Sequence, residues 1–381
     1  MTMKSKLFVY SLLSAALLAA GCKNLRNPAS VPPPSSMLQA RAELHKRNIS
    51  FDPDLFVRKA GDGDLESVEL FLQAGMNPDA TNQYGYTGLM WASGQGRAAV
   101  ARALLAKGAN VAKQARDGST ALISAASQGQ IETAELLIAH GADINAGKDQ
   151  SMPPLIAAAR EDRTVMVGRL LSKGADIDAR DSDGHTALFY AAYNFGSEDA
   201  NGATIPMVKL FLVHGAKVNV IGKDGSTPLM WAAAKGEVDI IEMLMTAGAD
   251  ANTADTNGKT ALLRATEGEA GPSAAKLLVS NGAQINVQDA DGDTALIKAS
   301  RRERAGMSAV LIALGAQLNI QNKRGETALM AAADHGNRVI ADGLLKSGAD
   351  PTLKNKNGQT ALDIAREEHT AAFERLKSAS Q

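Results

Sequence analysis

The histidines and the single cysteine are the most direct candidates for nucleophilic or metal chemistry, but their spacing is typical of neither. One cysteine cannot supply a paired-thiol zinc site, and the sequence has no H-E-x-x-H or G-x-S-x-G motif. His140 and His214 each precede a glycine, where a cation favours a helix C-terminus by about 0.3–1 kcal/mol. We therefore expect no catalytic residue. The six histidines are His45, His140, His185, His214, His335 and His369.

A second candidate for metal binding is the acidic stretch DARDSDG, residues 178–184. Carboxylates at alternating positions of a loop can converge on one calcium ion. In an EF-hand register that ends at Gly184, however, Ala179 would stand at the first ligand position and Tyr190 would replace the bidentate acid. The register fails, and the aspartates are better explained as turn residues. We expect no metal, no cofactor and no enzymatic activity.

Charge and composition restrict the remaining classes of function. The 381 residues include 40 Lys and Arg against 41 Asp and Glu, which gives a net charge of −1. Such a balance provides no general attraction to nucleic acid or to anionic lipid, so we expect no nucleic-acid partner. Hydrophobic residues make up 45% of the chain, enough to bury a large core. The sequence therefore favours a folded protein and leaves binding through its surface as the remaining class of function.

A repeated element organises most of the chain. The leucine of a T-[AP]-L element recurs mostly every 33 residues, with one interval of 34 after Leu262 and one of 41 after Leu188. Counting back 33 residues from Leu89 reaches Phe56 in a degenerate first copy, which gives ten units. The leucines are Leu89, Leu122, Leu155, Leu188, Leu229, Leu262, Leu296, Leu329 and Leu362.

Each unit is predicted to form two short helices joined by a turn. In the unit around Leu122, Thr120 can cap the first helix, and Gly129 makes the turn to the second. Gly141 stands where a helix ends in a left-handed residue, ahead of the next turn. The apolar residues with helical spacing are Leu122, Ala125 and Ala126 in the first helix and Ile131, Leu136 and Leu137 in the second.

This 33-residue pattern resembles the ankyrin repeat over residues 51–381. The resemblance implies an all-α ankyrin-repeat solenoid of about ten helix-turn-helix units with short β-hairpin or loop tips. One departure is systematic, because an apolar residue replaces the family's usual histidine after the leucine. We expect apolar packing in place of the family's Thr–His hydrogen bond. The replacing residues are Met90, Ile123, Ile156, Phe189, Met230, Leu263, Ile297 and Met330.

Three units are irregular. The unit around Leu155 lacks the usual threonine and turn glycine, and the unit around Leu296 has Glu303 where the glycine between the helices belongs. Stability of a repeat array comes mainly from interfaces between neighbours, so we expect these two units to open first. The unit around Leu188 carries eight extra residues near residues 194–206, between its two helices by register. They are either a tolerated loop or a second contact site.

The ankyrin resemblance implies a concave face, lined by the tips and first helices, on which a protein partner docks. Two residues after each leucine stand Trp91, Ser124, Ala157, Tyr190, Trp231, Arg264, Lys298 and Ala331. A column that accepts both Trp and Lys is expected to be exposed. Aromatic residues and arginines are the commonest binding hot spots, so we predict a two-part face, aromatic in the earlier units and basic in the later ones. Its candidate residues are Tyr84, Tyr86, Trp91, His185, Tyr190, Tyr193, Trp231, Arg264, Lys298 and Arg301.

Two alternatives remain for these residues. Trp91 and Trp231 could pack against a neighbouring helix, and the charged cluster at residues 301–304 could be a solvated turn. The array itself is expected to be monomeric.

The N-terminus predicts export and lipidation. Lys4 and Lys6 precede an apolar run of 14 residues, 7–20, which is too short to span a bilayer and suits a signal peptide. Small residues then lead to Cys22, an ending that resembles the lipobox of bacterial lipoproteins, although Leu18 stands one place early. An ordinary cleaved signal and an uncleaved anchor are the alternatives. The expected division is a lipoprotein signal peptide at 1–21, a lipidated, proline-rich tether at 22–50 and the ankyrin array at 51–381.

These features predict a lipid-tethered, protein-binding scaffold of the bacterial cell envelope. In the resembled lipoproteins, a residue other than aspartate after the cysteine favours the outer membrane, and here it is Lys23. The expected place is therefore the periplasmic face of the outer membrane, with the membrane bound through lipid on Cys22. The role could be inhibition of an envelope enzyme, as by an immunity protein, or organisation of a complex. The alternative is a structural envelope component without a tight partner.

Overall fold

The computed structural model describes residues 35–147, 152–193, 204–268 and 270–367, and within them the chain is all-helical. A leading helix, α1 (Ser35–Lys46), precedes alternating first and second helices of the repeats. The first helices are α2 (Pro53–Asp62), α4 (Gly88–Gly94), α6 (Ala121–Gln128), α8 (Pro154–Arg160), α10 (Ala187–Tyr193), α12 (Pro228–Lys235), α14 (Ala261–Glu267), α16 (Ala295–Arg301), α18 (Ala328–Asp334) and α20 (Ala361–Glu367). The second helices are α3 (Leu65–Gln73), α5 (Ala98–Ala106), α7 (Ile131–Ala139), α9 (Thr164–Ser172), α11 (Thr204–Val213), α13 (Val238–Thr246), α15 (Pro272–Ser280), α17 (Ala305–Ala313) and α19 (Arg338–Lys346).

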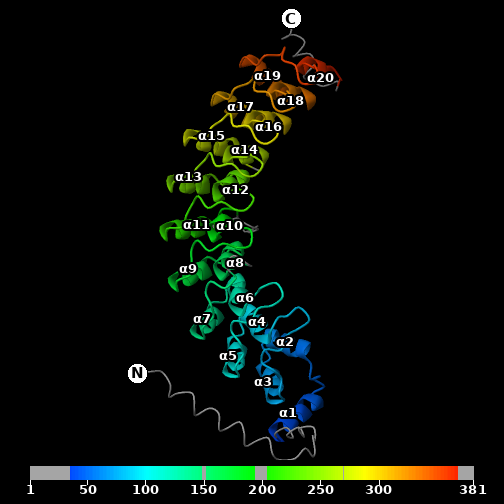
Figure 1. Cartoon of the computed structure of the whole chain (residues 1–381), viewed down its shortest axis with the longest axis vertical. Helices are drawn as coiled ribbons and strands as arrows, with labels where there is room; N and C mark the ends of the chain where they lie inside the picture. The colour runs from blue at the N-terminus through cyan, green and yellow to red at the C-terminus, as the bar shows by residue number, and fades with distance from the viewer. Residues whose placement is uncertain (1–34, 148–151, 194–203, 269, 368–381) are drawn as a thin grey trace, which may run out of the picture.

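The helices stack in two layers along one curved axis (Figure 1). Each first helix contacts the first helix of the next unit, and most second helices contact the next second helix, as α13 does α15 and α15 does α17. Ten first helices confirm the ten predicted units. Because no unit can bury its apolar face alone, one continuous core runs between the layers from α1 to α20.

The unit of α6 and α7 confirms the predicted local signals. The Thr120 side-chain oxygen accepts a hydrogen bond from the Ile123 amide at 3.2 Å and so caps α6. Gly129 ends that helix with φ of +71°, a left-handed conformation that glycine adopts without steric cost. Leu122 is 1% exposed and faces the core together with the small alanines of its helix. Small side chains allow the close stacking of neighbouring units.

The apolar column that replaces the family's histidine is buried, as expected. None of these side chains is more than 7% exposed, so the column packs into the core instead of forming a polar bridge. Its members are Met90, Ile123, Ile156, Phe189, Met230, Leu263, Ile297 and Met330.

The tips between units are turns and loops. Across the described ranges the structure contains no strand, and the single isolated β-bridge pairs Thr81 with Thr87. Asparagine and aspartate side chains accept backbone amides within the tips, as Asn82 does from Tyr84 and Tyr86 at 3.0 Å. Such local bonds fix the turn without a strand ladder.

The N-terminal boundary of the array lies earlier than the expected residue 51. Helix α1 packs against α3, with Ala40 and Leu44 buried in the common core. Arg41 also donates from its Nε to the Ala74 carbonyl at 3.0 Å. Residues 35–50, expected within the tether, therefore belong to the folded array and cover its first unit.

The irregular units show their departures directly. Pro153 occupies the position before α8 and supplies no side-chain cap, and Glu303 adopts φ of +56°. Helix α10 ends at Tyr193 and α11 begins at Thr204, so the insertion lies between the two helices of its unit, as its register predicts.

Three expected features fall on residues that the structure does not describe. They are Cys22 with its signal peptide, the tip of the insertion and the part of the predicted array from residue 368 onwards. Among the described helices, none has the length and hydropathy needed to cross a membrane.

Candidate protein-binding surface

An aromatic groove crosses the first helices near the N-terminal end of the array. Its volume is about 670 Å³, and a smaller hollow of about 310 Å³ lies beside it. Tyr84 and Trp91 line both, and they are 60% and 42% exposed. Large exposed aromatic side chains next to a hollow are typical of protein-binding sites. The groove is lined by Tyr84, Tyr86, Met90, Trp91, Gly94, Gln95, Asp117, Ser119, Ile123, Ser124, Ser127, Gln128, Met152 and Ala157.

Tyr86 is fixed across two tips. Its hydroxyl donates a hydrogen bond to Asp117, which lies in the following tip. This bond, together with partial burial, raises the pKa of Tyr86. Burial would raise the pKa of Asp117, but hydrogen bonds from Tyr86 and Ser119 outweigh it and lower that pKa. Asp117 is therefore ionised at neutral pH, and it supplies a fixed negative charge to the groove.

Trp91 lies over a glycine of the preceding unit. A Cβ at Gly61 would stand 2.8 Å from Cε3 of the indole, so only glycine leaves the ring this close to α2. On the other side, Gly94 and Ser124 bring α4 and α6 together, with 3.5 Å between the Ser124 Cβ and a Cβ built at Gly94. Small residues on both sides leave the indole partly exposed.

The aromatic residues of the central units form a packed cluster. The ring of Trp231 lies 4.4 Å from that of Tyr193 and 5.9 Å from that of Phe189, both edge-to-face. His185 stacks on Phe189 at 3.7 Å. The Tyr190 hydroxyl donates to Asp181 at 2.6 Å, and burial together with this bond raises its pKa. These side chains lie on the predicted face, but mutual packing occupies much of their surface.

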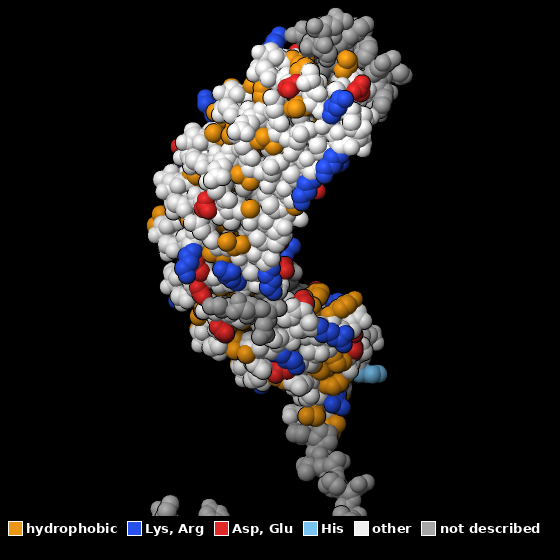
Figure 2. All heavy atoms as spheres, turned by 45° about the horizontal axis from the view of Figure 1, so that its top comes forward, with side chains coloured by type: hydrophobic (Ala, Val, Ile, Leu, Met, Phe, Trp, Pro, Cys, Tyr) orange, Lys and Arg blue, Asp and Glu red, His pale blue; other side chains and the backbone are white. Residues whose placement is uncertain are grey.

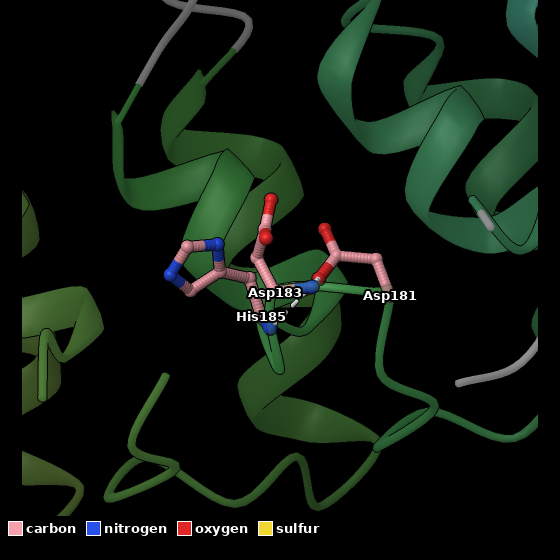
Figure 3. A group of neighbouring side chains, drawn as sticks. All are labelled: Asp181, Asp183 and His185. Carbon is pink, nitrogen blue, oxygen red and sulfur yellow. Dashed lines mark hydrogen bonds between the residues drawn. The ribbon is translucent and has the colours of Figure 1, made fainter. Parts of the chain in front are cut away.

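One group of residues has the spacing of a metal site. Asp181, Asp183 and His185 each offer one ligand atom, all within 4.8 Å of one another (Figure 3). Asp181 Oδ1 already accepts the amides of Asp183 and His185 at 2.9 and 3.0 Å, and its Oδ2 accepts the Tyr190 hydroxyl. The hydrogen bonds of a tip turn explain why these three side chains lie close together. We therefore assign no metal site to them.

The predicted exposure of the column two residues after the leucine is wrong at Ala157 and Ala331, which are 2% and 5% exposed, and at Lys298. Lys298 is 8% exposed, and its Nζ lies 2.7 Å from Asp289 and 2.8 Å from Glu267. Burial would lower the pKa of Lys298, but its hydrogen bonds to these two carboxylates raise it. An amine can be buried where Trp91 is exposed because acidic neighbours compensate its charge.

The other cations of the basic part are also paired. Arg264 binds Asp255, and Arg301 binds Asp293 and Glu326. Figure 2 shows Lys and Arg side chains along the hollowed side of the curved array, several of them next to acidic ones. The later units therefore present a network of ion pairs rather than a free basic surface.

The sequence did contain the signal for these acidic partners. Asp293 and Glu326 stand three residues before the leucines of their units, and Asp255 and Asp289 stand seven before theirs. The column seven residues before the leucine pairs with the column two residues after it in the same unit, as in Asp255–Arg264 and Asp289–Lys298, whereas Asp293 and Glu326 both pair with Arg301. The charge compensation is therefore visible in pairs of columns and not in any single column.

Comparison with known proteins places the repeats in a family. The model described as ankyrin repeats (3 copies) matches residues 56–148, 197–289, 264–355 and 308–380. A second ankyrin model (many copies) matches residues 155–194. An ankyrin repeat and LEM domain-containing protein 1 homolog from Caenorhabditis elegans is 40% identical over 58 residues, 15% of this chain and only 8% of that protein.

A solved structure agrees with the architecture. The human ASB11 ankyrin repeat domain superposes with a TM-score of 0.51 at 25% identity, covering 60% of this chain and 98% of that domain. The repeat length, the two helical layers and the matches over most of the sequence all lead to one assignment. The chain belongs to the ankyrin-repeat family.

Proposed function

We propose that the protein is a binding scaffold that holds a protein partner against the aromatic groove around Tyr84 and Trp91. Ankyrin repeats indicate a protein–protein interaction scaffold. The observation that carries the finer proposal is the exposure of these two rings beside a groove of about 670 Å³. Truncating such an aromatic hot spot costs on the order of 2 kcal/mol of binding free energy or more.

The packing narrows the proposed contact to the earlier units. Tyr190 and Trp231 already contact aromatic neighbours, and Arg264, Lys298 and Arg301 are paired with carboxylates. Contacts to these residues belong to the margin of the interface. Fully compensated ion pairs exchange little free energy with a partner, because each charge already has its counter-charge.

We further propose that the array is tethered in a bacterial cell envelope through lipid on Cys22. The support is in the sequence: Lys4 and Lys6, the apolar run at residues 7–20, and the small residues that precede Cys22. Lys23 supports the periplasmic face of the outer membrane. Two acyl chains attach a protein stably to a membrane, whereas a single chain gives only marginal attachment. Mass spectrometry of the mature N-terminus, with Cys22→Ser as the control, tests this part separately.

Within that setting, the favoured role is inhibition or organisation of an envelope enzyme. Affinity capture from crosslinked envelopes is the decisive experiment, with Tyr84→Ala/Trp91→Ala as the binding variant. Arg102→Ala/Lys107→Ala provides the control, because both residues are exposed in the second-helix layer, Arg102 within α5 and Lys107 directly after it. We expect the wild type and the control to retain one stoichiometric partner and the groove variant to lose it. Unchanged capture by the groove variant refutes the assignment, and the absence of any enriched protein favours a purely structural component.

A further inference from the structure

Two units of the array use the same column in different ways. Trp91 and Trp231 both stand two residues after their leucine, and the next unit contributes Ser124 beside Trp91 but Arg264 beside Trp231. The Arg264 guanidinium carbon lies 5.8 Å from the centroid of the Trp231 ring. A guanidinium at this separation is attracted by the electron-rich face of an indole. The protein thus contains its own example of a cation held beside a tryptophan of this column.

The carboxylate that holds Arg264 is also specific to that unit. Asp255 binds the guanidinium from the tip, with its side chain 0% exposed. Ala115 is the equivalent tip residue in the unit after Trp91. Both the guanidinium and its carboxylate are therefore replaced by small residues there, and Ser124, which stands in the place of Arg264, lines the groove.

The lining of the groove is suited to a positive charge. Of its fourteen residues, Asp117 is the only charged one, and no Lys or Arg is among them. The aromatic rings of Tyr84, Tyr86 and Trp91 surround the same hollow. A carboxylate next to aromatic faces attracts a cation by charge and by the ring quadrupole. The groove therefore has the components of a cation site and lacks the cation that the Trp231 unit provides for itself.

We propose that the groove binds an arginine side chain of the protein partner, whose guanidinium lies beside Trp91 and pairs with Asp117. A planar guanidinium stacks on an indole and donates two parallel hydrogen bonds to one carboxylate, which an ammonium cannot do. Asp117 already accepts the Ser119 amide at Oδ1 and the Tyr86 hydroxyl at Oδ2, and each of these oxygens has a second lone pair for the guanidinium. The inference rests on the proposed function, because it specifies which chemistry the partner presents to the groove.

A peptide titration followed by Trp91 fluorescence tests the proposal. The probes are acetyl-Gly-Arg-Gly-amide and its lysine and citrulline counterparts, and the protein is the full chain with Trp231→Phe, which leaves Trp91 as the sole tryptophan. We expect saturable binding of the arginine peptide and binding of the neutral citrulline peptide weaker by about tenfold or more. Equal binding of arginine and citrulline overturns the proposal. Equal binding of lysine overturns the guanidinium assignment in favour of any cation.

Variants of the groove provide the second arm. Asp117→Asn should weaken the arginine peptide by about tenfold, because it removes the charge and keeps a hydrogen-bond acceptor. Ser124→Arg/Ala115→Asp copies the Trp231 unit and should abolish binding by filling the groove. Ser124→Ala is the matched control and should bind like the parent. Retained binding in the filled variant, with helicity unchanged by circular dichroism, contradicts the proposal. If that variant does not fold, Asp117→Asn decides.

The outcomes separate this inference from the proposed function. If Tyr84→Ala/Trp91→Ala loses the envelope partner while no arginine peptide binds, the scaffold proposal stands and the arginine site is wrong. If the arginine peptide binds while no protein is captured, the site stands and the scaffold proposal is wrong.

Discussion

The Nζ of Lys298 lies 2.7 Å from Oδ2 of Asp289, in a position only 8% exposed. In another unit the same column is occupied by Trp91, which is 42% exposed. One column of a repeat can therefore serve either the surface or the packing of the array, according to the tip residue that faces it.

Removing the buried amine should destabilise the later units strongly. Lys298→Met leaves Asp289 and Glu267 without their shared cation, and breaking one side of a buried pair costs about 3–5 kcal/mol. We expect a lower urea midpoint than in the wild type. Lys217→Met is the control, because the Lys217–Asp178 pair is exposed at its amine and should be worth less than about 1 kcal/mol. Equal losses in the two variants would contradict the buried network.

Acid should weaken the same network. Burial raises the pKa of Glu267 and Asp293, but bonds from Lys259 and Lys298 to Glu267, and from Arg301 and Asn322 to Asp293, lower both pKa values below the usual 4.5 and 3.8. A lowered folded-state pKa stabilises the protein above the unfolded-state pKa, and this contribution is lost as the pH falls through the folded-state value.

The thermal midpoint should therefore be flat above about pH 5 and fall below it. Glu267→Gln/Asp293→Asn should start from a lower midpoint and show a shallower fall. The other carboxylates with lowered pKa, such as Asp64 and Asp224, keep part of the slope in both proteins. An unchanged slope in the double variant would show that these pairs do not control the acid response.

A single methyl group at Gly268 should separate two units. A Cβ there would lie 2.0 Å from the carbonyl oxygen of Ala234, a backbone atom that cannot rotate away. We expect Gly268→Ala to destabilise the array by about 1–3 kcal/mol, the usual cost of overpacking. Gly343→Ala is the matched control in α19, where nothing lies within 4 Å, and it should stabilise the helix by up to about 1 kcal/mol. Differential scanning calorimetry of the two variants and the wild type measures both changes in stability.

Replacing Glu303 by glycine should stabilise the protein. Glu303 adopts φ of +56° at the turn before α17, a conformation that costs a residue with a side chain about 1–2 kcal/mol. Glu161→Gly is the comparison, because Glu161 has φ of −93° and gains nothing from glycine. A loss of stability in Glu303→Gly would mean that its side chain contributes more than the strain removes.

Native-state hydrogen exchange should distinguish the two irregular units. The sequence alone predicts early opening around both Leu155 and Leu296. The structure favours α8, which has no side-chain cap, over α16, which Lys298 and Arg301 pin to neighbouring tips. We expect the amides of α8 and α9 to exchange before those of α16 and α17. The reverse order would show that the ion pairs do not restrain local opening.

Much of the fold follows from local signals in the sequence. The threonine caps, the left-handed glycines and the 33-residue period fix the helices of each unit almost independently of the others. The position at which the array begins could not be predicted in this way, because the sequence of α1 lacks the repeat pattern. Only its contact with α3 reveals that Ala40 and Leu44 belong to the core.

The candidate surface was less predictable than the fold. Trp91 and Trp231 have the same place in their units, yet one rests on Gly61 and the other on Tyr193 and Arg264. Exposure depends on residues about 33 positions away in both directions. The residue types of the sequence indicated which column contributes to the surface. The neighbouring units determine whether each side chain of that column is exposed or packed.

The packing of α1 on α3 has a consequence for where a captured molecule can be. If lipid holds Cys22, twelve residues, 23–34, link the membrane to Ser35, the first residue that the structure describes. At ~3.1 Å per residue their greatest span is roughly 37 Å. The groove belongs to the units at this tethered end. The tether would therefore keep the groove close to the bilayer surface. A partner that is itself bound to the envelope would meet the groove at a high local concentration.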